Sequence, residues 1–167
     1  MPAYELHPAP SDSPACDPIT GLPSRARLLD ALQRMLEDAR RTGCPVAVLN
    51  IRLVGRDPRS AVDGAAPLLR DSADLVRMII RDCGLAARVS GDDFAVALAE
   101  VRHPSVALGT ARRLHRALRG LHGSAGHIGV ALYPDDALDA EALIRAAERA
   151  TPTMDAVGYA RAPIQTG

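Results

Sequence analysis

The sequence predicts a mixed α/β domain of the α+β class, in which helices pack on a central sheet. Apolar residues recur with the 3.6-residue period of a helix in four segments, and four shorter segments show the apolar patterns of strands. Prolines, glycines and polar turns separate the two kinds of segment. With 167 residues, 47% of them hydrophobic, the chain is long enough to bury the core of one domain.

The two ends of the chain differ in composition from its middle. Residues 1–16 contain four prolines and few apolar side chains, so we expect a disordered N-terminal lead-in there. The domain itself is expected to span residues 17–162, and residues 163–167 are expected to form a short C-terminal tail.

Four helices are expected from amphipathic stripes that begin at capping residues or prolines and end at glycine or proline. Cys83 belongs to the buried stripe expected for the second helix, and Leu121 belongs to that of the third. We expect these helices between Ser24 and Gly43, between Pro67 and Gly84, from Pro104 through Leu121, and between Asp139 and Thr151.

The first expected strand, Val46–Val54, is apolar on both faces at its start, and only the face of Asn50 and Arg52 turns polar near its end. This pattern is typical of a central strand whose far end borders a cleft. A hairpin is expected over Arg88–Leu98, because its Gly-Asp centre supplies the positive φ positions that hairpin turns require. The last expected strand is Ile128–Tyr133.

The order of these elements is helix, strand, helix, hairpin, helix, strand, helix. Its central part, β-α-β-β-α-β, matches the ferredoxin-like plan, an antiparallel-containing sheet with its helices packed on one face.

Charge and rare residue types exclude several classes of protein. The net charge is zero without a basic run, and aromatic residues make up 2%, so we expect no nucleic-acid binding. No window approaches the ~18 apolar residues of a membrane span, and the N-terminus lacks a signal-peptide stretch, so no membrane insertion is expected. Three cysteines without CxxC spacing argue against disulfide or zinc frameworks and favour a cytoplasmic protein.

Three separated motifs, in order, resemble the GGDEF domain of diguanylate cyclases. They are Asp17–Arg25 (DPITGLPSR), Arg88–Phe94 (RVSGDDF) and Gly129–Pro134 (GVALYP), and the similarity covers about residues 17–160. The resemblance implies a cyclase-like palm fold. It also implies an activity in which two domains, each holding GTP and a divalent metal ion, face each other to make cyclic di-GMP.

The positions that carry metal-binding carboxylates in this family have changed. Asn50 replaces a carboxylate by a neutral amide, and Arg52 places a permanent cation on the same strand face. Asp92 matches the family's acidic third hairpin position, whereas Asp93 stands where active members carry Glu. We therefore interpret Asp92 and Asp93 as vestigial catalytic residues, Asn50 and Asp92 as vestigial metal ligands, and Arg52 as an internal substitute for the cation.

The resemblance also indicates residues that face phosphate groups. Ser90 takes the place of the family's first hairpin glycine, and Gly91 keeps the second. The family's product-binding RxxD motif retains Arg81, but its Asp is replaced by Gly84. Arg81 and Arg88 could hold a phosphate as a pair, and the alternative is that both are ordinary surface charges.

The sequence thus predicts a catalytically degenerate GGDEF-type domain that acts as a non-enzymatic interaction module in bacterial cyclic di-GMP signalling. One alternative is an active or weak diguanylate cyclase, which would need Mg²⁺; otherwise no cofactor is expected. A further alternative is a GTP-binding regulator without turnover. We expect a protein partner, and GTP or cyclic di-GMP as candidate ligands.

Overall fold

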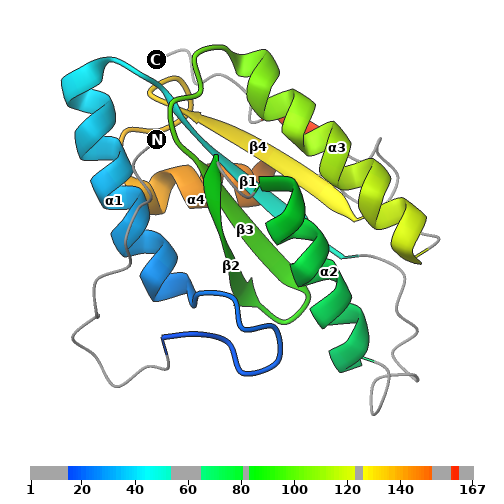
Figure 1. Ribbon diagram of the computed structural model, residues 1–167. Helices are drawn as coiled ribbons and strands as arrows, with labels where there is room; N and C mark the ends of the chain where they lie inside the picture. The colour runs from blue at the N-terminus through cyan, green and yellow to red at the C-terminus, as the bar shows by residue number, and fades with distance from the viewer. Residues whose placement is uncertain (1–14, 54–64, 81–82, 123–125, 152–158, 162–167) are drawn as a thin grey trace.

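The computed structural model describes residues 15–53, 65–80, 83–122, 126–151 and 159–161. One twisted five-stranded sheet runs through the molecule in the order β2-β3-β1-β4-β5, with helices on both of its faces (Figure 1). The elements are α1 (Arg25–Thr42), β1 (Val46–Arg52), α2 (Ala65–Ile80), β2 (Gly84–Ser90), β3 (Asp93–Leu98), α3 (Pro104–His122), β4 (His127–Tyr133), α4 (Ala140–Ala150) and β5 (Tyr159–Arg161).

The strand β1 lies at the centre of the sheet, antiparallel to both β3 and β4. Its first six residues are buried, and the last, Arg52, is exposed. The sequence therefore predicted both the class of the fold and the central place of this strand. The three-residue strand β5, which runs parallel to β4, was not predicted.

The two faces of the sheet carry separate cores, because alternate β1 side chains point in opposite directions. Ala47, Leu49 and Ile51 pack with α2 and α3, the two helices of the ferredoxin-like part. Val46 and Val48 pack on the other face with α1 and α4. This arrangement explains why β1 is apolar on both faces.

The predicted end of one helix was wrong, and so were two predicted members of buried stripes. Helix α2 ends at Ile80, and Cys83 is exposed outside it rather than part of a buried stripe. Gly84 does not end the helix but begins β2, where a Cβ atom would collide with the carbonyl oxygen of Ala97. Leu121 in the last turn of α3 is 42% exposed, so this apolar stripe ends at Leu118.

The two N-cap residues expected from the sequence, Ser24 and Asp139, each precede a helix. Asp139 caps α4, and its side chain accepts a hydrogen bond from the Ala142 amide at 2.8 Å. Ser24 occupies the N-cap position of α1 without a side-chain capping bond. Cys16, at the end of the expected lead-in, forms an isolated β-bridge with Pro23.

The last turn of α4 lies directly against β4 at Gly129. A Cβ atom at this position would collide with the carbonyl oxygen of Ala147 and the amide nitrogen of Thr151. Glycine is therefore required here for close approach of helix and strand. No helix of the described residues is both long and apolar enough to cross a membrane.

The same chemical change should have opposite effects at two glycines. Gly129→Ala should lower the free energy of unfolding by about 3 kcal/mol, because the helix must move away from the strand. Gly109→Ala in α3 should raise it by about 0.5–1 kcal/mol, since its Cβ position has nothing within 4 Å and Ala favours the helix. Urea unfolding of both variants checks this, and equal effects would contradict the close contact at Gly129.

Candidate functional site

The tip of the β2–β3 hairpin brings most of the predicted site residues together. Gly91 and Asp92 form the turn, and Gly91 has a φ of 34°, whereas Asp92 does not have a positive φ. The register shifts between Arg88 and Ser90, so β2 is irregular immediately before the turn. The carbonyl oxygen of Asp92 accepts a hydrogen bond from the Leu53 amide at 3.1 Å, which joins the turn to the end of β1.

Arg52 and Asp93 face each other directly across β1 and β3. Arg52 Nε donates to Asp93 Oδ1 at 3.0 Å, and Nη2 donates to Oδ2 at 3.4 Å. The Ser90 hydroxyl donates to the same Oδ2 at 3.4 Å. The Arg52 side chain is 51% exposed and that of Asp93 21%, so water screens the pair and its contribution to stability is about 0–1 kcal/mol.

Asn50 lies two residues before Arg52 on the same strand face, but it is buried, with 1% of its surface exposed. Its Nδ2 donates to the Thr151 hydroxyl at 2.9 Å, and that hydroxyl donates to the Ala147 carbonyl at 3.0 Å. Asn50 Oδ1 has no hydrogen-bond partner among the described residues. The amide therefore fastens the end of α4 to the sheet.

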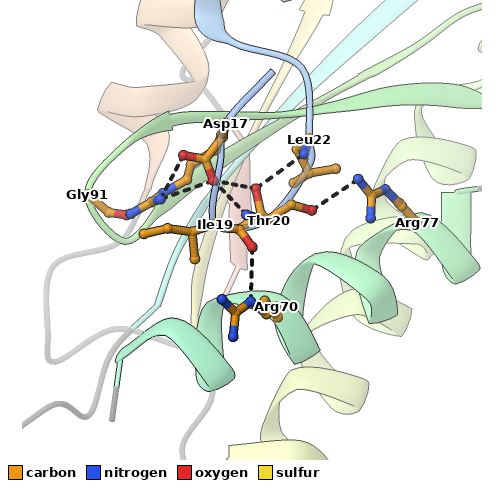
Figure 2. A network of polar contacts seen from close by, with 8 residues as sticks. Asp17, Ile19, Thr20, Leu22, Arg70, Arg77 and Gly91 are labelled. Carbon is orange, nitrogen blue, oxygen red and sulfur yellow. Dashed lines mark hydrogen bonds and ion pairs between the residues drawn. The ribbon is translucent and has the colours of Figure 1, made fainter. Parts of the chain in front are cut away.

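Arg88 is held by contacts within the chain, to Asp17 and Gly91, which are both labelled in Figure 2. Its Nη1 donates to both carboxylate oxygens of Asp17, at 2.9 and 3.1 Å. Its Nε and Nη2 both donate to the Gly91 carbonyl, at 2.9 and 2.8 Å. These bonds engage all three guanidinium nitrogens, which argues against the prediction of a phosphate held by Arg88. Its predicted companion, Arg81, lies outside the described residues.

The turn that begins at Asp17 is built around the Asp17 carboxylate. Asp17 Oδ1 accepts from the Thr20 amide at 2.8 Å and from the Thr20 hydroxyl at 2.7 Å. Two arginines of α2 bind carbonyl oxygens of the same turn: Arg70 donates to Ile19 at 3.2 Å and Arg77 to Thr20 at 3.1 Å (Figure 2). Burial alone would raise the pKa of Asp17, but the bonds from Thr20 and Arg88 outweigh burial and lower it.

Sequence reasoning identified Asp17 as part of a motif but missed its partner. The spacing Asp17-x-x-Thr20 is a local signal for a turn closed by the aspartate side chain. The ion pair with Arg88 joins residues 71 positions apart, and no local pattern indicates it. The Asn50–Thr151 bond, 101 positions apart, was missed for the same reason.

The acidic residues that the structure describes do not form a metal cluster. Within the described ranges, no group of three or more His, Cys, Asp or Glu side chains is placed to hold an ion. At the hairpin tip, Asp93 is paired with Arg52, and Asn50 offers a neutral amide instead of a carboxylate. Mg²⁺ uses one or two carboxylates together with water and phosphate oxygens, and of the two carboxylates at the turn, Asp93 is already bonded to Arg52.

A cavity of about 130 Å³ lies away from this site. It is bounded by the end of α1, the start of β1 and the segment after β3, including Cys44, Val46 and Glu100. Val46 begins β1 and Arg52 ends it, so the cavity is at the opposite end of the central strand. It is not part of the hairpin site.

Comparison with known proteins gives the family. A model of the family described as "Diguanylate cyclase, GGDEF domain" matches residues 63–158, more than half of the chain. The chain belongs to the GGDEF domain family. This agrees with the resemblance drawn from the three motifs, two of which lie within the matched residues.

Relatives and solved structures agree with this assignment. Diguanylate cyclase TpbB from Pseudomonas aeruginosa is 32% identical over 145 residues, which are 80% of this chain and 33% of that protein. The crystal structure of the TpbB GGDEF domain matches the present structure with a TM-score of 0.76 and 29% sequence identity. The match covers 87% of our chain and 99% of the TpbB domain. This chain spans a third or less of the length of the curated relatives it matches.

A third similar structure contains a second protein. It is the diguanylate cyclase SiaD in complex with its activator SiaC, from Pseudomonas aeruginosa, with a TM-score of 0.68 and 22% identity. The match covers 81% of this chain and 58% of that one, and at this identity it shows the fold alone.

Asp17→Asn should lower the free energy of unfolding by about 2 kcal/mol at pH 7, because a charged hydrogen-bonding partner of Arg88 is lost. Since the folded-state pKa of Asp17 is lowered, its stabilisation is fully present above the unfolded pKa of about 4. It is lost as the pH falls through the folded value. Urea unfolding at pH 7 and at about pH 3 should therefore give a smaller difference from the native chain at the acidic pH.

Asp38→Asn is the matched control, because Asp38 pairs with Arg41 on the surface, where the two side chains are 45% and 75% exposed. It should change the free energy of unfolding by less than about 0.5 kcal/mol. Equal losses in the two variants would contradict a special role for Asp17.

Proposed function

We propose that this GGDEF domain is catalytically degenerate and serves as a non-enzymatic interaction module in bacterial cyclic di-GMP signalling. The observation that carries the proposal is the ion pair of Arg52 with Asp93 at the hairpin tip. It places a guanidinium beside the acidic turn that would have to bind a metal ion. The names of the relatives, cyclases and a phosphodiesterase of cyclic di-GMP, support the signalling context.

Phosphoryl transfer from GTP needs a divalent ion to bind the triphosphate oxygens and stabilise the developing charge. At ~4 Å and an effective dielectric constant of about 20, a fixed positive charge repels each unit of like charge by about 4 kcal/mol. The exposure of Arg52 reduces this repulsion but does not reverse its sign. Arg52 therefore opposes an ion at the tip.

The neighbouring residues support the same proposal. Asn50 is buried and bonded to Thr151, so it serves the packing of α4 rather than an open ligand site. Arg88 is bonded to Asp17 and Gly91, so a phosphate would have to replace existing bonds to bind it. A chain with these contacts is better suited to present a surface than to turn over GTP.

The alternative of an active or weak cyclase is favoured by one feature of the site. Asp92 retains the family's acidic third position on the half-buried turn.

A cytoplasmic interaction module agrees with the three cysteines Cys16, Cys44 and Cys83, which form no disulfide. The partner that we propose is another protein, as SiaC is for SiaD.

Enzyme assays separate these functions. The full chain, incubated with GTP and Mg²⁺ or Mn²⁺, should form no more cyclic di-GMP than an enzyme-free control, with the diguanylate cyclase TpbB as the positive control. Sustained synthesis that is lost in Asp92→Ala would overturn the proposal. Calorimetry with a nonhydrolysable GTP analogue should show no binding heat, and saturable heat would favour a GTP-binding regulator instead.

The role assigned to Arg52 can be tested by metal binding alone. Arg52→Asp removes the cation and adds a carboxylate opposite Asp93, so Mn²⁺ should bind about tenfold more tightly than to the native chain. Arg52→Gln separates the two effects, because it removes the cation without adding a ligand, and it should give an intermediate affinity. Calorimetric titration measures all three, and native affinity equal to that of Arg52→Asp would contradict the role.

A further inference from the structure

Helix α3 concentrates positive charge in a chain whose formal net charge is zero. The helix carries four arginines and no acidic residue. All four, Arg112, Arg113, Arg116 and Arg119, are exposed. Arg112, Arg116 and Arg119 recur at the i, i+4, i+7 spacing of one helix face, over about 10 Å of its length. We call the surface of these four side chains the α3 arginine surface.

Three of these four arginines, Arg113, Arg116 and Arg119, have no carboxylate partner among the residues that the structure describes. Arg113 Nη2 donates to the Ile79 carbonyl of α2 at 3.4 Å, which leaves its charge uncompensated. The half-buried His115 has a lowered pKa because of burial and the charges of Arg119 and His127, which agrees with a locally positive surface.

The other helices do not share this composition. Helix α4 balances Arg145 and Arg149 with Glu141 and Glu148, and α1 and α2 also mix both signs. A second copy of this chain therefore offers, among its described helices, no acidic helix to match α3. Among the described helices none complements α3, whereas an acidic helix of a different protein would.

A second feature makes the surface accessible to a partner helix. Gly120 lies one turn after Arg116, and a Cβ atom there would have nothing within 4 Å among the described residues. Glycine is unfavourable in a helix, and no packing within the described chain requires it at this position. Next to it, Leu121 is 42% exposed. The end of α3 therefore has no projecting side chain at Gly120 and exposes part of the apolar Leu121 side chain, close to the arginines.

We propose that the α3 arginine surface docks an acidic helical segment of a partner protein, whose Asp or Glu residues recur about once per turn. Arginine guanidinium groups bind carboxylates in a planar, two-bonded geometry, which a row at helical spacing can use repeatedly. A nucleic acid fits less well, because the chain has 2% aromatic residues and no net positive charge to attract a phosphate backbone. An anionic membrane fits less well because the surface lacks Trp and Phe anchors. The inference does not depend on whether the hairpin site is active.

A binding experiment with a defined probe tests this inference. The probe is a labelled, alanine-based helical peptide of about 18 residues with glutamates at i, i+4, i+7 and i+11. Its control carries glutamines at those positions. The full chain should bind the glutamate peptide in fluorescence anisotropy and not the glutamine peptide. NMR amide shifts should change mainly along α3, and affinity should fall as salt is added.

A matched pair of variants localises the effect. Arg116→Gln with Arg119→Gln should weaken binding about three- to tenfold, the loss expected for two exposed charge contacts. Arg145→Gln with Arg149→Gln removes the same charge from exposed positions of α4 and should leave the affinity unchanged. Thermal unfolding verifies that both double variants fold.

Three results would overturn the inference. The first is no detectable binding of the glutamate peptide. The second is an equal loss in the α3 and α4 variants, which would show dependence on total charge alone. The third is tighter binding to duplex DNA or to phosphatidylserine vesicles, weakened by the α3 variant, which would assign the surface to nucleic acid or to lipid.

Discussion

The Arg88 guanidinium is the contact on which the arrangement of the first two motifs depends. One part of it binds the Asp17 carboxylate and another binds the Gly91 carbonyl, so a single side chain joins the entry turn to the hairpin tip. Both Arg88 and Asp17 are only 16% exposed, where a charge without its partner is costly. The family's first and second motifs are therefore coupled by electrostatics as well as by sequence order.

The central strand shows how one position can serve either packing or chemistry. Up to Ile51, β1 is surrounded by core on both faces, and at Arg52 it reaches solvent. Asn50 lies at the transition, where an amide can satisfy a neighbouring hydroxyl without carrying charge into the core. The neutral Asn50 permits α4 to close over this position, whereas an ionised carboxylate would need a cation or water there.

The sequence predicts the fold well where a pattern is periodic and local. The two apolar faces of Val46–Val48 place β1 at the centre of the sheet, and Asp139 and Gly43 mark helix ends as their chemistry requires. Prediction fails where one residue type has two uses. Gly84 serves strand approach rather than a helix end, and Cys83 was consequently assigned to the wrong element.

The candidate site could be predicted only in part, because its contacts join distant segments. The identities of Asn50, Arg52 and Asp93 are evident from the sequence, and their register follows from the hairpin and the central strand. The sequence does not indicate, however, which partner each side chain binds. Arg88 binds Asp17, and Asn50 binds Thr151, because tertiary packing brings together side chains that no local spacing relates. The strand β5, with three residues, is too short to show alternation.

Every cationic side chain in the ion pairs described above is an arginine, and the chain has no lysine at all. Guanidinium groups keep their proton in strongly alkaline solution, where lysine ammonium groups lose theirs. The electrostatic contacts at the hairpin and the entry turn are consequently insensitive to base.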